Sequence, residues 1–201
     1  MKFLKLVAYC VTALFLFTGC QSSDNAAIEV KMKSNEELKE IADTYTYEDY
    51  KRVLEEAVAE ASKFEKDGKL NKWIIRTLAQ EKLNYETDLT DDQVLKLAEK
   101  SLEEDKVWKS IAEDKYDVTV TEDQVDKYIK EGPDTFDLPQ MQAYADALGL
   151  SLEELNHNFD RDNYEKNVMW LKLKPELEKK YGITGNNKQV EKYEEEVEKQ
   201  L

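Results

Sequence analysis

Apolar residues recur at steps of three and four along most of the chain, with charged residues between them. This is the spacing of one face of an amphipathic α-helix. The short loop at Asp67 and Gly68 predicts that the first two helices form an antiparallel hairpin, and Pro175 is expected to kink or divide the last one. The pattern therefore predicts an all-α fold, with helices over residues 46–64, 70–85, 90–112, 121–131, 137–148 and 151–181.

A further helix is predicted at the C-terminal end, after a hinge at 183–187. Its apolar residues lie on one helical face and are Val190, Tyr193, Val197 and Leu201. A helix this short is not stable alone in water, so its apolar face should be buried against something. We expect it to return to the N-terminal hairpin, near Trp73 and Leu78, and the alternative is that it binds a client or partner.

Composition narrows the chemistry that the chain can perform. The 36% charged residues suit solvated helices, whereas six Gly and three Pro in 201 residues are too few for the turns of a β-sandwich. A net charge of −15 makes nucleic acid or an anionic membrane surface an unfavourable partner. His157 is the only histidine and no cysteine follows Cys20, so zinc clusters and His-dependent triads have no residues to build them.

The numerous carboxylates do not select a metal or catalytic site either. Asp160, Asp162 and Glu165 stand close together, but they lack the glycine turn of a calcium loop. Among 44 acidic residues no pair can be singled out for glycoside hydrolysis. We expect neither a metal ion nor another cofactor, and we expect His157 to be a solvated residue near a helix start.

The N-terminus is typical of an export signal. Lys2 and Lys5 precede an apolar run at 6–17 that is too short to span a bilayer. The following Thr18, Gly19 and Cys20 resemble the lipobox of bacterial lipoproteins, which implies that residues 1–19 are removed and that Cys20 carries lipid. Two acyl chains would anchor the protein stably, and residues 20–33 would form a flexible tether. An ordinary signal with a chance cysteine, or an uncleaved anchor helix, are the alternatives.

Two segments carry a second resemblance. Residues 117–129, DVTVTEDQVDKYI, and residues 144–155, YADALGLSLEEL, resemble the SurA-type N-terminal chaperone domain, which is shared by SurA, PrsA foldases and the C-terminal region of trigger factor. The resemblance implies a helical domain at 34–182 with a long arm helix, and a C-terminal helix at 183–201 that packs back on it. Relatives also carry a parvulin prolyl-isomerase domain, for which this chain has neither the histidines nor strand patterns.

The expected function follows from both resemblances. They imply a non-enzymatic chaperone or foldase-like protein, anchored by Cys20 to the extracytoplasmic face of the membrane of a Gram-positive cell, that binds unfolded or nascent secreted proteins through an apolar groove. The alternative is a scaffold or adaptor lipoprotein with one folded partner. Methionine and aromatic side chains suit varied clients, although each could equally be ordinary core. The candidates are Met141, Tyr144, Met169 and Trp170.

Overall fold

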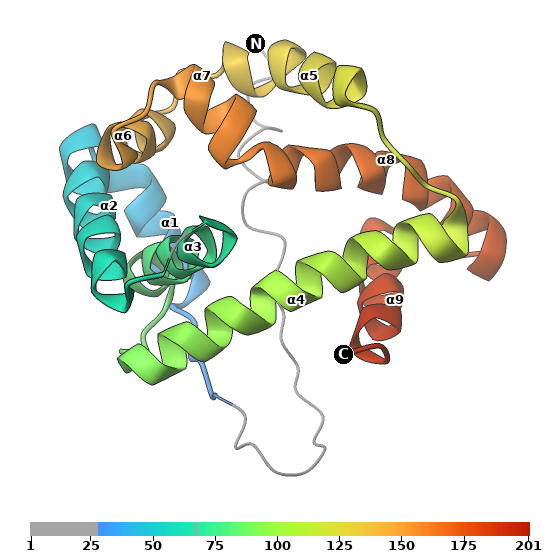
Figure 1. The fold of residues 1–201 in the computed structure, drawn as a ribbon, viewed down its shortest axis with the longest axis horizontal. Coiled ribbons are helices and arrows are strands. Elements are labelled where there is room, and N and C mark those ends of the chain that lie inside the picture. The colour runs from blue at the N-terminus through green and yellow to red at the C-terminus, as the bar shows by residue number, and fades with distance from the viewer. Residues whose placement is uncertain (1–27, 67) are drawn as a thin grey trace.

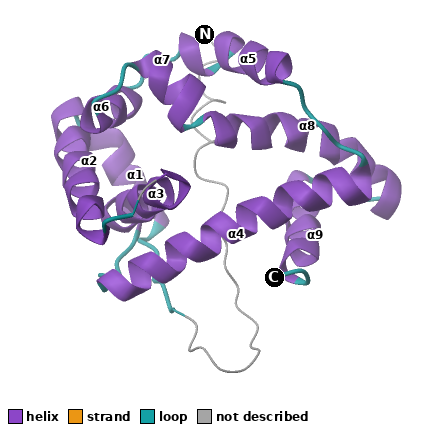
Figure 2. Cartoon of the chain, in the orientation of Figure 1, coloured by secondary structure: helices purple, strands orange, loops and turns teal. Residues whose placement is uncertain are grey.

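The computed structural model describes residues 28–66 and 68–201, and it is all-α (Figure 1). Within these ranges 79% of the chain is helical and no strand forms, which confirms the predicted fold class (Figure 2). The nearest approach to a sheet is an isolated bridge between Met32 and Tyr85. No helix in the described part combines the length and the apolar character that crossing a membrane requires.

A first hydrophobic core lies at the N-terminal end of the fold. It is formed by α2 (Tyr47–Ala61), α3 (Gly68–Asn84), the start of α4 (Asp91–Tyr116) and α6 (Pro139–Leu148), with α1 (Asn35–Thr44) packed beside α3. α2 and α3 are the predicted hairpin, joined through a short 3-10 turn. The side chains that these helices bury together are Tyr50, Leu54, Ala57, Ile74, Ile75, Leu78, Val94, Ala98 and Ala143.

A second core lies at the other end of α4, about which α8 (Arg161–Tyr181) and α9 (Asn186–Glu198) are packed (Figure 1). Because α4 is 26 residues long, its first turns belong to one core and its last turns to the other. The buried residues of this second core are Trp108, Ile111, Ala112, Tyr116, Val118, Met169, Leu173, Leu177, Tyr193 and Val197.

α5 (Glu122–Glu131) and α7 (Leu152–Glu154) complete the connection between the two ends. α5 lies along α8 and buries Val125 and Ile129. Capping boxes stand at the starts of α4, α5 and α7, where a Thr or Ser hydroxyl accepts a hydrogen bond from the backbone N–H three residues later in the chain. Their residues are Thr90 with Gln93, Thr121 with Gln124, and Ser151 with Glu154.

The predicted division of the longest helix at Pro175 is wrong. α8 continues through Pro175 to Tyr181, and the break comes earlier, at a π-helical turn over Leu155–Phe159. The break has a physical cause, because Lys72 and Arg76 of α3 donate to the carbonyl oxygen of Phe159 at 3.0 and 3.1 Å. That carbonyl is satisfied by cations from another helix and needs no partner in α8.

The expected position of the C-terminal helix is also corrected. α9 packs on α4 and α8, whereas Trp73 and Leu78 belong to the first core. Tyr193 and Val197 are buried as the pattern predicts, but Leu201 lies beyond the helix and is 53% exposed. α4 already presents an aromatic surface at its C-terminal end, next to the point where α8 ends, so α9 reaches it without crossing the molecule.

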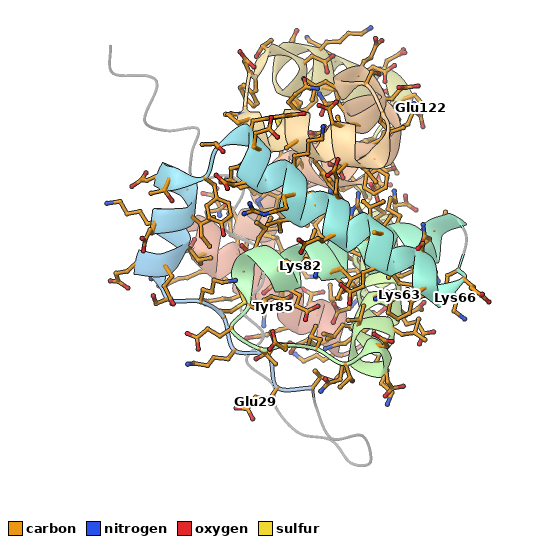
Figure 3. All side chains as sticks on the ribbon, turned by 90° about the vertical axis from the view of Figure 1, so that its left-hand side faces the viewer. Glu29, Lys63, Lys66, Lys82, Tyr85 and Glu122 are labelled. Carbon is orange, nitrogen blue, oxygen red and sulfur yellow. The ribbon has the colours of Figure 1, made fainter. Side chains whose placement is uncertain are left out.

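The end of the expected tether is attached to the domain. The backbone of Lys33 donates to Asn84 and that of Glu86 donates to Lys31, each at 2.8 Å. The Lys33 ammonium also donates to the carbonyls of Lys82 and Tyr85, which lie at the end of α3 (Figure 3). Residues 28–30 carry no regular structure, so the chain joins the fold at Lys31.

Candidate functional site

The four predicted client-binding residues do not form one surface. Met141 and Tyr144 lie on α6, at the first core, and both are half-buried. Met169 and Trp170 lie on α8, at the second core, where Met169 is only 1% exposed and Trp170 is half-buried. Cys20, the predicted lipidation site, is outside the described residues. Met169 can therefore meet a client only if its cover is removed.

That cover is α9. Tyr193 stands with its ring edge-on to Trp108, at 5.0 Å between centroids, and at 5.8 Å from Tyr116. Its ring is also 6.2 Å from that of Trp170, and its hydroxyl donates to the carbonyl oxygen of Trp108 at 2.7 Å. We use the name α4–α8 surface for six side chains of this core on α4 and α8, of which the two tryptophans and the tyrosine contact Tyr193: Trp108, Tyr116, Met169, Trp170, Leu173 and Leu177.

A buried carboxylate fixes α9 beside this surface. Glu196 accepts hydrogen bonds from the hydroxyls of Tyr116 on α4 and Tyr181 on α8, and its side chain is 10% exposed. Lys115 and Lys180 lie 3.4 and 3.8 Å from its oxygens. Burial alone would raise the pKa of Glu196, but the two hydroxyls and the charge of Lys180 lower it below its usual range. The group is therefore a stable anion that joins three helices.

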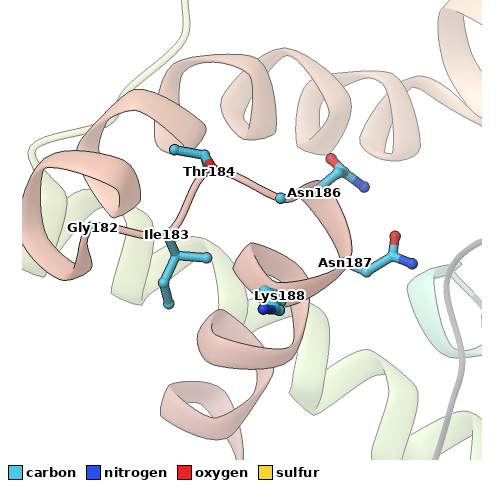
Figure 4. A pocket seen from close by; sticks show the side chains of 7 residues that line it. Gly182, Ile183, Thr184, Asn186, Asn187 and Lys188 are labelled. Atoms are coloured by element: carbon cyan, nitrogen blue, oxygen red, sulfur yellow. The ribbon is translucent and has the colours of Figure 1, made fainter.

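The loop before α9 is held by a buried amide. Gln189 is 2% exposed, and its side chain donates to the carbonyl oxygens of Lys174 and Ile183 at 3.1 and 2.8 Å. Trp170 donates to the Asn186 side chain at 3.3 Å. The loop over 182–188 surrounds a hollow of about 550 Å³ that is open to solvent (Figure 4). Its lining, taken over the residues that the structure describes, combines Ile183, Thr184 and Lys188 with two glycines and two asparagines, and contains no acidic or aromatic side chain.

The most buried charged cluster lies elsewhere, between α3 and the start of α8. Arg76, whose side chain is 11% exposed, donates to both oxygens of Asp162 at 2.9 and 2.7 Å and to Asp160 at 2.9 Å. Lys72 lies 2.9 Å from Asp162. Arg76 also stacks over the rings of Trp73 and Phe159. The cluster binds the break after the π-helical turn to α3.

The two aspartates of this cluster differ in their electrostatics. Burial dominates at Asp160 and raises its pKa despite Arg76. Burial also opposes ionisation of Asp162, but the hydrogen bonds from Arg76 and Lys72 prevail and hold the pKa of Asp162 well below its usual range. The nearby Tyr144 hydroxyl is buried without a hydrogen-bond partner in the described part of the chain, and burial raises its pKa.

The remaining acid of the group considered for calcium, Glu165, and the single histidine, His157, both form ion pairs or close contacts within the protein. Glu165 pairs with Lys109 at 2.8 Å, and His157 lies 2.9 Å from Asp134. In the part of the chain that the structure describes, no group of His, Cys, Asp or Glu could hold a metal ion. The carboxylates of Asp160, Asp162 and Glu165 are paired with Arg76, Lys72 and Lys109.

Comparison with family models, curated proteins and solved structures found no match to this chain. The two segments that carry the chaperone resemblance can still be placed. Residues 117–129 form the turn after α4 and most of α5, and residues 144–155 run from α6 into the π-helical turn. They build the connection between the two cores and bury Val118, Val125, Ile129 and Leu155.

Sequence reasoning missed Arg76, Gln189 and Glu196, which hold the α-helices together. One signal was available for Arg76: the apolar stripe of the last long helix is interrupted after Phe159 by Asp160, Arg161 and Asp162. Such an interruption indicates a polar junction. Glu196 stands inside the acidic run 194–196, and the available signal was its position three residues after Tyr193, which places it on the apolar face of α9, whereas Glu195 is exposed.

Proposed function

We propose that this protein is a lipid-anchored, extracytoplasmic binding protein for unfolded secreted polypeptides, that it works without a catalytic step, and that the α4–α8 surface is its client site. The observation that carries the proposal is the composition of this surface. Two tryptophans, a tyrosine, a methionine and two leucines gather on two long helices, and the three aromatic rings lie against Tyr193 of a short separate helix.

Such a surface suits clients without a defined structure. Tryptophan and tyrosine offer large apolar area with a polar edge, and the unbranched methionine side chain repacks around different neighbours. An unfolded chain exposes apolar segments of many sequences, so its binder needs a large apolar area that can adapt to them. The position of Met169 and Trp170 on this surface supports the prediction made for them, whereas Met141 and Tyr144 lie at the other core.

The anchoring part of the proposal rests on the sequence. The lipobox resemblance at Cys20 supports lipidation, and about eleven residues between Cys20 and Lys31 would reach at most some 40 Å from the bilayer. The full chain has a formal charge of −15, and removal of residues 1–19 takes away two lysines, which leaves −17. A domain with this charge has no affinity for anionic lipid. A lipid is thus the proposed means of attachment.

Client breadth tests the proposal against the alternative of a dedicated adaptor. The full-length chain is added in increasing amounts to three unrelated proteins that have been denatured and diluted into buffer, and light scattering follows their aggregation. Slower aggregation of all three supports a general binder. Protection of none, together with capture of one folded envelope protein by crosslinking in cells, would replace it with the adaptor.

A further inference from the structure

The helix that covers the proposed client site is itself attached by few and specific contacts. Four residues of α9 are buried, and two of them, Gln189 and Glu196, are polar. Tyr193 and Val197 are its fully buried apolar side chains, with Val190 half-buried. α9 therefore binds the α4–α8 surface with the aromatic ring of Tyr193, the carboxylate of Glu196 and the branched side chain of Val197. The carboxylate follows the aromatic residue by three positions and the aliphatic residue follows it by four.

We propose that α9 is a displaceable internal ligand of the α4–α8 surface, and that the clients which compete with it are amphipathic helical segments with this same aromatic, acidic and aliphatic spacing. The inference rests on the proposed function, because it identifies the class of client that the site takes. It also assigns a resting state, in which α9 keeps the site covered.

The start of α9 shows why it can leave. α1, α2, α4, α5 and α7 begin with a capping box, whereas α6, α8 and α9 have no side-chain cap, and the cap position of α9 is Gly185. The preceding Gly182 has a positive φ of 68°, a conformation that glycine adopts without strain. The connection to α8 is thus short and flexible in sequence, and α9 can move while α8 stays in place.

The end of α9 is electrostatically unfavourable. Glu195, Glu196 and Glu198 lie in its last turn, which contains no basic residue, and Lys199 follows at the cap position. Carboxylates at this end oppose the helix dipole. Burial raises the pKa of Glu194, the charge of Lys166 opposes this rise, and the charges of Glu198 and Glu104 add to it. The acidic end therefore lowers the stability of α9 as a helix.

The contacts of α9 define what a competitor must supply. Its carboxylate must reach the hydroxyls of Tyr116 and Tyr181 between Lys115 and Lys180. Its aromatic ring must enter between Trp108 and Trp170, and a hydroxyl on that ring gains the carbonyl of Trp108. Helical spacing places these groups on one face, since residues three and four apart are neighbours there.

The test uses the full-length chain and a fluorescent peptide of residues 185–201, whose binding is followed by anisotropy. Glu196→Gln removes the charge that holds α9, and Glu195→Gln removes the same charge from the exposed neighbour, which pairs only with Lys192 among the described residues. The apparent affinity of a site that is covered part of the time is its intrinsic affinity multiplied by the fraction of molecules in which it is open. We therefore expect Glu196→Gln to bind the peptide about tenfold more tightly than the wild type does. Glu195→Gln should bind it as the wild type does. Tyr193→Ala, which leaves α4 and α8 intact, should act as Glu196→Gln does.

The outcomes separate the two proposals. Equal peptide affinity in the wild type, Glu196→Gln and Tyr193→Ala overturns the displaceable helix, whatever the aggregation assay gives. If the chain protects denatured proteins but Glu196→Gln protects no better than Glu195→Gln, the proposed function stands and the competition by α9 is wrong. If the peptide binds as expected but no form of the chain protects any client, α9 is displaceable and the proposed function fails.

Discussion

Arg76 and Asp162 are 86 positions apart in the sequence and form a bidentate ion pair in the fold, with nitrogen to oxygen distances of 2.9 and 2.7 Å. Arg76 lies on α3, which contributes to the first core, and Asp162 lies in the first turn of α8, which leads to the second core. The pair therefore fixes the position of α8 relative to the hairpin. The pair lies at the start of α8, directly after the π-helical turn, where α8 has no side-chain cap.

Replacement of Arg76 by alanine should destabilise the protein strongly. It leaves Asp160 buried without its ion-pair partner and Asp162 with Lys72 alone, and the loss of one partner from a buried pair costs about 3–5 kcal/mol. The control is Arg52→Ala, because Arg52 pairs with Asp49 at the surface and its side chain is 65% exposed. Urea unfolding should show a large fall in the free energy of unfolding for Arg76→Ala and little change for Arg52→Ala. Similar values for the two variants would contradict the structural role of the cluster.

The two aspartates of the cluster should give opposite pH dependences. The pKa of Asp162 is lowered on folding, so its contribution to stability is present above the unfolded pKa of about 4 and is lost as the pH falls below it. The pKa of Asp160 is raised on folding, so the folded state takes up a proton first and Asp160 adds stability as the pH falls towards about 4.

Asparagine variants measure each contribution. The difference in free energy of unfolding between the wild type and Asp162→Asn should shrink as the pH falls from about 4 to about 2.5. The difference between the wild type and Asp160→Asn should instead grow in favour of the wild type as the pH falls from about 7 to about 4. Differences that change with the same sign would contradict this account of the cluster.

The local structure of this chain could be predicted from its sequence because it depends on neighbours in the sequence. Apolar spacing located the long helices, and the hydroxyls of Thr90, Thr121 and Ser151 marked three helix starts. Gly149 closes α6 with a positive φ of 68°, as a glycine after the last helical residue predicts. These are interactions within one or two turns, where spacing alone fixes the partners.

The tertiary contacts could not be predicted in the same way. The face of α9 was visible in the sequence, but many apolar faces could have received it, and only the fold decides that Tyr193 meets Trp108 rather than Trp73. Buried polar residues are harder still, because Glu196 differs from Glu195 only by a rotation of 100° about the helix. Pro175 was misjudged for a related reason: its cost is local, whereas the break near Phe159 is stabilised by cations from α3.

Deletion of residues 186–201 should lower the melting temperature. The deletion removes Tyr193 and Val197 from the second core and exposes the α4–α8 surface to water, which should cost a few kcal/mol and therefore at least about 4 °C. Leu201→Ser serves as the control, because Leu201 is 53% exposed and its loss should leave the melting temperature unchanged. Calorimetry of the three proteins decides. A truncated chain that melts like the wild type would show that α9 does not contribute to the fold.

Substitution of Cys20 should release the protein from the membrane. The lipobox resemblance makes Cys20 the attachment point, and the acidic domain has no other affinity for anionic lipid. Cys20→Ser is compared with Cys10→Ser, which changes a cysteine inside the expected signal and should stay membrane-bound. Detergent-phase partitioning of envelope fractions measures both. Cys20→Ser protein that remains in the detergent phase would exclude lipid on this cysteine as the anchor.

The central claim is that the protein binds unfolded polypeptides and not their folded forms. The most direct measurement titrates the full-length chain into one labelled model protein in two states, native and permanently unfolded by reduction and carboxymethylation, and follows anisotropy in the same buffer. We expect saturable binding to the unfolded form, weakened by an excess of the 185–201 peptide, and no binding to the native form. Binding to neither form, or equal binding to both, would contradict the claim.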